Sequence, residues 1–210
     1  MQRSLFDISR LFLSLFQDLP PMSRALYVPG AVLLLGYPVL VVLLGAESQG
    51  QAFVTAFMLA LSVRVALGFD GMVRRMLSRY SRGETVLLAL AIAVLPMAIL
   101  SFAVDPLSCQ RLQSAFYLVI GAVFLSDVIK NRATTAASFW PDVEMRAHLP
   151  NLTRVMVVYN FGFLLLNETL IRTLAASHWL LFWAVLPIIG HAILRALVLT
   201  VVNLEDSQPV

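Results

Sequence analysis

Charged residues are scarce in this sequence, and their scarcity excludes an ordinary soluble domain. Only 13% of the 210 residues are charged and 60% are hydrophobic, with a mean hydropathy of +0.85. Soluble globular domains carry about 25% charged residues. The composition therefore indicates a chain that is solvated by lipid.

Cysteine and lysine are almost absent as well. Cys109 is the single cysteine, which excludes an intramolecular disulfide and a cysteine-rich metal site, and we expect it to be a small loop residue. Lys130 is the single lysine among fifteen basic residues, and the arginines cluster between apolar runs. Because they form no stripe with interleaved aromatic residues, the net charge of +3 favours a role in membrane orientation, and nucleic acid is not an expected partner.

Recognisable catalytic motifs are also missing from the sequence. It contains no GxSxG, HExxH, GxGxxG or P-loop pattern. The histidines are His148, His178 and His191, and their spacing is not that of a haem or zinc site. We therefore expect a protein that is not an enzyme and that binds no cofactor or metal.

Apolar runs, in contrast, are long and numerous. A helix needs about 20 residues to cross a hydrocarbon core of about 30 Å. Six runs approach that length and cover residues 25–46, 51–69, 85–104, 113–130, 155–175 and 178–202. The sequence predicts an all-α fold, a polytopic transmembrane helical bundle of six spans, with five spans as the alternative. This single bundle fills residues 21–203, and residues 204–210 form a cytoplasmic tail.

The first twenty residues, "MQRSLFDISRLFLSLFQDLP", do not fit a signal peptide. Asp7 and Arg10 interrupt the apolar stretch, and no small-residue cleavage site follows. Apolar residues recur at helical spacing opposite the charged ones. Residues 1–20 are therefore predicted to form an amphipathic helix in the membrane interface, and a short helix packed on the spans is the alternative.

Basic residues between the apolar runs predict the orientation of the chain. In a six-span arrangement the arginine-rich segment 70–84, the segment 130–154 and the basic N-terminal residues lie on one side of the membrane. Because Lys and Arg near span ends resist translocation, this side is the cytoplasmic one. We expect a bacterial inner-membrane protein with cytoplasmic N- and C-termini.

The segment 70–84, "DGMVRRMLSRYSRGE", interleaves arginines with apolar residues. A helix there could lie on the inner leaflet and bind anionic lipid. The candidate lipid contacts are Arg74, Arg75, Arg79 and Arg82. Fixing the membrane topology is the alternative role for the same arginines.

Three other charged residues fall inside predicted spans, close to their predicted cytoplasmic ends. They are Arg64, Asp127 and Arg195. Long side chains at such positions can extend to the membrane surface, and Asp127 can meet Lys130. We expect them to anchor the helix ends.

The stretch "NETLIRTLAASHW", residues 167–179, places polar side chains deeper in the membrane. Glu168 and Arg172 are one helical turn apart, while Asn160 and Asn167 are seven residues apart and face nearly the same side. These four residues form a candidate polar wedge. Since polar groups are costly in lipid, the wedge predicts either hydrogen bonds between helices or a polar pocket open to the outside.

Within the wedge we expect Arg172 to lie beside Glu168 on its water side. Arg172→Leu is then expected to harm the protein more than Glu168→Gln, because it leaves an acid without its partner whereas glutamine still forms hydrogen bonds.

The C-terminal half resembles a known family. "RLQSAFYLVIGAVFLSDVIKNR" followed by "LTRVMVVYNFGFLLLNETLIRTLAASHWLLFW" is similar in order and texture to the bacterial intracellular septation protein A family and its uncharacterised membrane relatives. "LYVPGAVLLLGYPVLVVLL" also looks like the family's opening helix. Asn131-Arg132 stands where the family tends to have Lys-Pro, and Phe182-Trp183 where it has Phe-Lys.

This resemblance implies a multi-pass inner-membrane protein that supports septation or the cell envelope, without catalytic residues. The expected partners are the lipid bilayer and other membrane proteins of the envelope or division machinery. The alternative function is a transporter for a small solute, an ion or a lipid, which would use Glu168, Arg172 and spans bent by proline.

Overall fold

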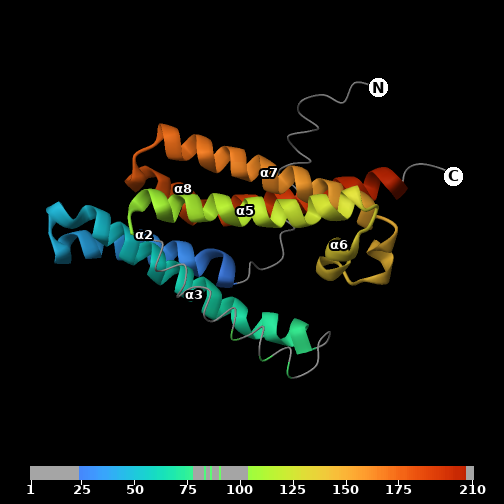
Figure 1. The fold of residues 1–210 in the computed structure, drawn as a ribbon, viewed down its shortest axis with the longest axis horizontal. Helices are drawn as coiled ribbons and strands as arrows, with labels where there is room; N and C mark the ends of the chain where they lie inside the picture. The colour runs from blue at the N-terminus through green and yellow to red at the C-terminus, as the bar shows by residue number, and fades with distance from the viewer. Residues whose placement is uncertain (1–23, 78–82, 84–85, 87–89, 91–103, 207–210) are drawn as a thin grey trace. The chain divides into compact units, whose positions relative to one another are not determined.

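All secondary structure in the described part of the chain is helical. A computed structural model describes residues 24–77, 83, 86, 90 and 104–206 (Figure 1). Its elements are α2 (Arg24–Leu44), the 3-10 turn η1 (Ala46–Ser48), α3 (Gln49–Leu77), α5 (Pro106–Ile129), α6 (Thr134–Phe139), the 3-10 turn η2 (Val143–Arg146), α7 (Leu149–Thr173) and α8 (Ala176–Asp206). The all-α prediction is confirmed for these residues.

Five of the described helices are long and apolar enough to cross a membrane. The spans are Leu26–Leu44, Gln49–Phe69, Pro106–Ile129, Leu149–Thr173 and Ala176–Val202. They are compatible with the predicted bundle of membrane helices. The N-terminal helix predicted at 1–20 lies outside the described residues, as does nearly all of the run predicted at 85–104, so both stay predictions.

Helix α5 begins seven residues before the apolar run that predicted it. The backbone amide of Ser108 donates a hydrogen bond to the Asp105 carboxylate at 2.8 Å, and the Cys109 amide donates to the Asp105 carbonyl at 3.2 Å. Pro106 fits the first helical position because no amide donor is needed there. Cys109 therefore lies in a helix and is fully buried, so the expectation of a loop residue was wrong.

The opposite end of α5 is closed by Asn131. This residue has a left-handed backbone with φ of 49°, which Asn tolerates better than most residues. The Arg132 amide donates to the Asp127 carbonyl at 2.8 Å, and the Asn131 amide donates to the Val128 carbonyl at 3.1 Å. These bonds satisfy two end carbonyls and turn the chain out of the helix.

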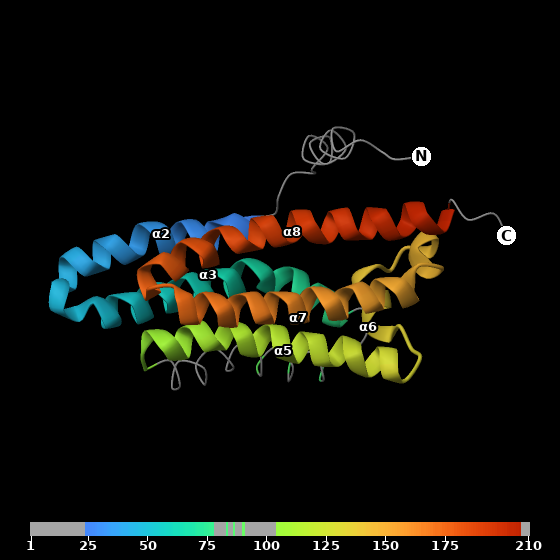
Figure 2. The ribbon, with the colours of Figure 1, turned by 90° about the horizontal axis from the view of Figure 1, so that it is seen from above.

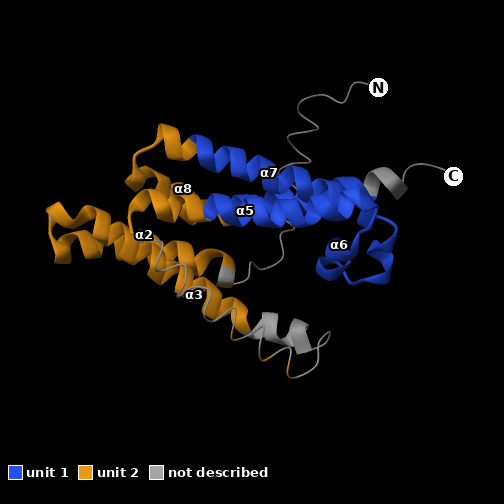
Figure 3. Ribbon diagram, viewed as in Figure 1, with its two compact units in different colours: residues 1–22, 113–169, 188–210 blue, residues 23–112, 170–187 orange. Residues whose placement is uncertain are grey.

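The chain divides into two compact units (Figure 3). Unit 1 comprises residues 1–22, 113–169 and 188–210, and unit 2 comprises residues 23–112 and 170–187. The boundaries fall within α5, α7 and α8, so each of these helices supplies residues to both units.

Unit 2 has a core of aromatic side chains. Its helices α2 and α3 run antiparallel and side by side, joined at Gly45, whose φ of 86° favours glycine (Figures 1 and 2). The ring centroids of Phe57 and Trp183 are 5.3 Å apart, and those of Phe53 and Trp179 are 6.1 Å apart. All four side chains are buried, so this cluster holds α3 against the first turns of α8.

Unit 1 is built around the antiparallel pair α5 and α7, which lie side by side (Figures 1 and 2). Tyr117 of α5 meets Phe163 of α7, with ring centroids 5.6 Å apart. A second buried cluster joins Phe124 of α5 and Met156 of α7 to Ala136 of α6. The unit therefore brings residues of α5 against residues of α7 that come 32 to 46 positions later in the chain.

Candidate functional site

Three polar residues of unit 1 form a hydrogen-bonded chain between α5 and α7. The Asn167 amide Nδ2 donates to Ser114 Oγ at 2.8 Å, and the Ser114 hydroxyl donates to Glu168 Oε1 at 2.6 Å. Asn167 is 1% exposed and Ser114 is 6% exposed, while Glu168 is partly buried. We name these three residues the polar clamp.

The spacing of small residues on α5 explains why the helices approach here. Ser114 and Gly121 are seven residues apart on α5, as are Asn160 and Asn167 on α7, so each asparagine faces a small residue. A Cβ atom at Gly121 would lie 3.3 Å from the Cβ of Asn160. The two helices therefore need small residues at both positions to keep their separation.

Asn160, the first wedge residue, is 3% exposed but does not reach across to α5 with its amide. Its Nδ2 donates to the Met156 carbonyl of its own helix at 2.7 Å. The side chain thus fills the space beside Gly121 while its donor is satisfied within α7.

Arg172, the last wedge residue, is exposed. Among the described residues the structure shows no ion pair between Arg172 and Glu168. Glu168 instead accepts its hydrogen bond from Ser114. The clamp therefore contains two of the four predicted wedge residues, and it adds Ser114, which the sequence analysis did not single out.

The clamp is poorly suited to catalysis. A serine nucleophile must reach its substrate, whereas Ser114 is buried between two helices. The described residues also contain no group of three or more His, Cys, Asp or Glu side chains that could hold a metal ion. The arrangement can hold helices together, since interhelical hydrogen bonds in membranes contribute about 0.6 kcal/mol each and up to about 1.7 kcal/mol.

The predicted lipid contacts follow the span in α3. Arg74 and Arg75 belong to the last turns of this helix, and their side chains lie outside the described part of the structure. Arg79 and Arg82 lie outside the described residues. Their role in lipid binding stays a prediction.

Arg64 makes a contact that the sequence analysis missed. Its guanidinium carbon lies 4.4 Å from the centre of the Trp183 ring, in the geometry of a cation–π interaction. Trp183 is 3% exposed and belongs to the aromatic core of unit 2. Arg64 of α3 thus contacts the ring of a residue on α8, and no sequence pattern predicts this pairing.

Asp127 has other partners than the expected Lys130. Its carboxylate accepts hydrogen bonds from the Thr135 amide at 2.7 Å and from Thr134 Oγ1 at 3.0 and 3.1 Å. No ion pair with Lys130 appears, although both residues are described. The backbone turn at Asn131 brings α6 back to the carboxylate, which explains the change of partner.

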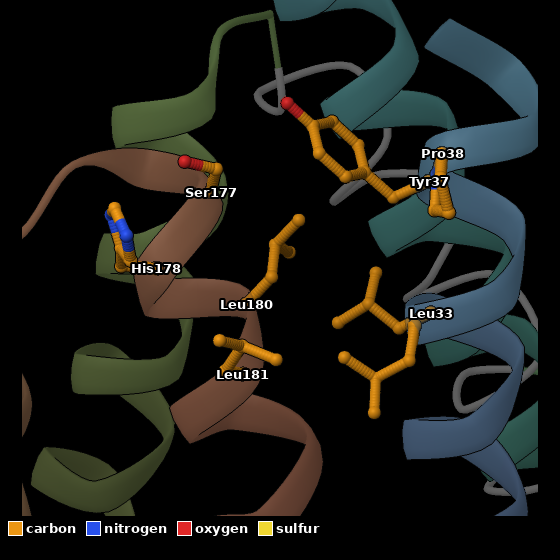
Figure 4. A pocket seen from close by; sticks show the side chains of 8 residues that line it. Leu33, Tyr37, Pro38, Ser177, His178, Leu180 and Leu181 are labelled. Atoms are coloured by element: carbon orange, nitrogen blue, oxygen red, sulfur yellow. The ribbon is translucent and has the colours of Figure 1, made fainter. Parts of the chain in front are cut away.

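Unit 2 contains a second candidate site, an apolar pocket of about 310 Å³ between α2 and the start of α8 (Figure 4). It is lined by Leu33, Leu34, Tyr37, Pro38, Ser177, His178, Leu180 and Leu181. Leu180 points toward Leu33 across it, while His178 lies on the side of α8 away from Leu33. The sequence analysis missed this pocket because its two walls are about 140 residues apart in the chain.

Two sites thus stand out, a buried polar clamp in unit 1 and an apolar pocket in unit 2. The clamp is closed by its own hydrogen bonds, and the pocket is lined by four leucines together with Tyr37, Pro38, Ser177 and His178. In comparisons with family models, with curated proteins and with solved structures, no match was found for this chain.

Proposed function

We propose that this protein is a non-enzymatic, multi-pass inner-membrane protein that supports the cell envelope or the division machinery through helix contacts. The proposal combines the resemblance to the septation protein A family with one observation. Ser114, buried on α5, accepts a hydrogen bond from Asn167 and donates one to Glu168, so its hydroxyl joins α5 to α7.

The buried clamp supports a contact role over a transport role. A solute pathway is lined by polar or ionisable side chains that face a water-filled cavity. Ser114 and Asn167 are at most 6% exposed, and leucines form half of the walls of the pocket in unit 2. Polar residues used in this way fix the register of two helices and leave their outer faces for lipid and for protein partners.

Photo-cross-linking to partner proteins in intact cells tests this proposal. A photo-reactive amino acid at Phe116, which is 58% exposed on α5, should cross-link the protein to identified envelope or division proteins in intact cells. The control is the same group at Phe163, which is 7% exposed and faces Tyr117. Equal cross-linking from both positions, or cross-linking only to abundant unrelated proteins, contradicts the proposal.

Glu168 favours transport as a second candidate function. Its carboxylate is only partly buried, within a helix long enough to span the membrane, and such groups mark ion and proton pathways. Flux of protons or small cations into liposomes that contain the purified protein, abolished by Glu168→Gln in a folded variant, would establish this function. If the flux is the same in liposomes with and without the protein, the transport function is contradicted.

A further inference from the structure

The connection between α5 and α7 is an ordered element that is fixed to the end of α5. Helix α6 has six residues, and none of its own flanking side chains caps its start. The Asp127 carboxylate does so from α5, through the Thr135 amide at 2.7 Å. A helix this short needs such tertiary support, because isolated helices of this length do not form in water.

Packing supports the same placement of α6. Ala133, Ala136 and Ala137 turn toward the cluster around Phe124 and Met156. Trp140 packs against the same cluster, and the Phe139 ring lies 5.7 Å from the ring of Phe124, so the connection is held to the bundle on one side. We name residues 130–148, which join the spans ending at Ile129 and starting at Leu149, the α6 platform.

Two large apolar side chains of the platform remain exposed. Phe139 is 58% exposed and Val143 is 71% exposed, and Trp140, which packs on the cluster, lies beside Phe139 with ring centroids 6.1 Å apart. They lie in the short connection between the span that ends at Ile129 and the span that begins at Leu149. Aromatic residues concentrate at this level of a membrane, where their rings meet the lipid head groups.

Basic residues share the platform with these apolar groups. Lys130, Arg132 and Arg146 are all exposed, against the exposed carboxylates of Asp142 and Glu144. The Asp127 carboxylate, 8% exposed, is engaged by α6. The excess of positive charge beside exposed apolar groups is complementary to a phospholipid that has an anionic head group and apolar chains.

We propose that the α6 platform lies in the head-group layer of the membrane and binds anionic phospholipid. Phe139 and Val143 enter the upper acyl-chain region, and Lys130, Arg132 and Arg146 contact the phosphates. The occupant is the protein's own bilayer. This role does not depend on the proposed contact function, since a transporter could carry the same platform.

Spin-label accessibility in nanodiscs tests the depth of the platform. Nitroxide labels are placed at Val143→Cys and, as a neighbouring control, at Glu144→Cys, both in a Cys109→Ala background. In discs containing phosphatidylglycerol, the label at 143 should be reached more readily by oxygen than by a water-soluble nickel chelate, and the label at 144 should show the reverse order. Equal nickel access at both positions overturns the proposal.

Charge removal tests the lipid class with the same protein. Lys130, Arg132 and Arg146 are replaced together by Gln, and the bound phosphatidylglycerol is measured by native mass spectrometry. The affinity for this lipid should fall by about fivefold for each positive charge removed. The matched control is Arg111→Gln, which removes an exposed arginine near the opposite end of α5. Equal retention by both variants, or retention of free phosphate in place of the lipid, contradicts the proposal.

Discussion

The hydroxyl of Ser114 lies 2.6 Å from a carboxylate oxygen of Glu168, 54 residues later in the chain. The same hydroxyl oxygen accepts a hydrogen bond from the amide of Asn167 at 2.8 Å. One small side chain on α5 therefore satisfies two polar groups of α7. Because polar groups within a membrane-spanning helix depend on partners inside the protein, Ser114 contributes to the stability of this helix pair.

Ser114→Ala should destabilise the protein measurably. The change removes the hydrogen bond that Asn167 donates and the one that Glu168 accepts, at a cost of about 1–2 kcal/mol in the free energy of unfolding. Unfolding in mixed micelles measures this quantity. Ser126→Ala on the same helix is the control, because the Ser126 side chain makes no hydrogen bond within the described part of the chain. A loss for Ser114→Ala no larger than for the control would show that the clamp is dispensable.

The sequence-based expectation was that Arg172→Leu harms the protein more than Glu168→Gln, and the structure adds a comparison of Arg172→Leu with the apolar replacement Glu168→Leu. Arg172 is exposed and forms no ion pair with Glu168, so Arg172→Leu should change the free energy of unfolding by less than about 0.5 kcal/mol. Glu168→Leu removes the acceptor of the Ser114 hydroxyl and should cost about 1–3 kcal/mol. Folded yield and unfolding in mixed micelles compare the two variants, and a larger loss from Arg172→Leu than from Glu168→Leu would contradict this prediction.

Gly30→Ala and Gly36→Ala form a matched pair on α2. A Cβ atom at Gly30 would lie 2.6 Å from the carbonyl oxygen of Ala184, a backbone atom that cannot rotate away, whereas nothing lies within 4 Å of a Cβ at Gly36. We expect Gly30→Ala to cost about 1–3 kcal/mol through overpacking and Gly36→Ala to gain up to about 1 kcal/mol through helix propensity. Thermal unfolding of both variants checks the sign, and similar midpoints would contradict the close approach.

Asp105 should make stability depend on pH in the acid range. The pKa of Asp105 lies below the ordinary value of 3.8, and the largest cause is the hydrogen bond from the Ser108 amide, which favours the charged carboxylate. Because the folded-state pKa is the lower one, the stabilisation is present above pH 3.8 and is lost as the pH falls through the folded-state pKa. Asp105→Asn keeps a capping side chain without the charge, so its unfolding midpoint should fall less between pH 5 and pH 3 than that of the unaltered protein. Parallel pH profiles would contradict this account.

The helical fold follows from the sequence because lipid leaves the backbone few alternatives. Runs of apolar residues long enough to span a membrane must form helices, and the described helices coincide with five of the predicted runs. Hydropathy alone misplaced the start of α5, since the polar residues of its first turn broke the apolar run. The dipeptide Asp105-Pro106, a capping residue followed by the residue best suited to the first helical position, was the local signal for that start.

Only the part of the candidate site that lies on α7 could be predicted from the sequence. Asn160 and Asn167 share a face of one helix, and their spacing alone reveals it. Ser114 carries no such signal, because a serine in an apolar helix is common and its partner lies 53 residues away. The pairing of Arg64 with Trp183 was hidden for the same reason, since it depends on how helices far apart in sequence pack together.

The most direct test of the clamp as a fixed helix contact is a covalent lock between its two helices. Ser114→Cys and Asn167→Cys are combined with Cys109→Ala, the pair is oxidised in cells, and growth of a strain that depends on the protein is followed. Our account predicts that the cross-link forms and that the locked protein still supports growth and normal cell shape, because α5 and α7 need not separate. A locked and correctly folded protein that fails to support growth would contradict it, and would show that the helices move apart during function.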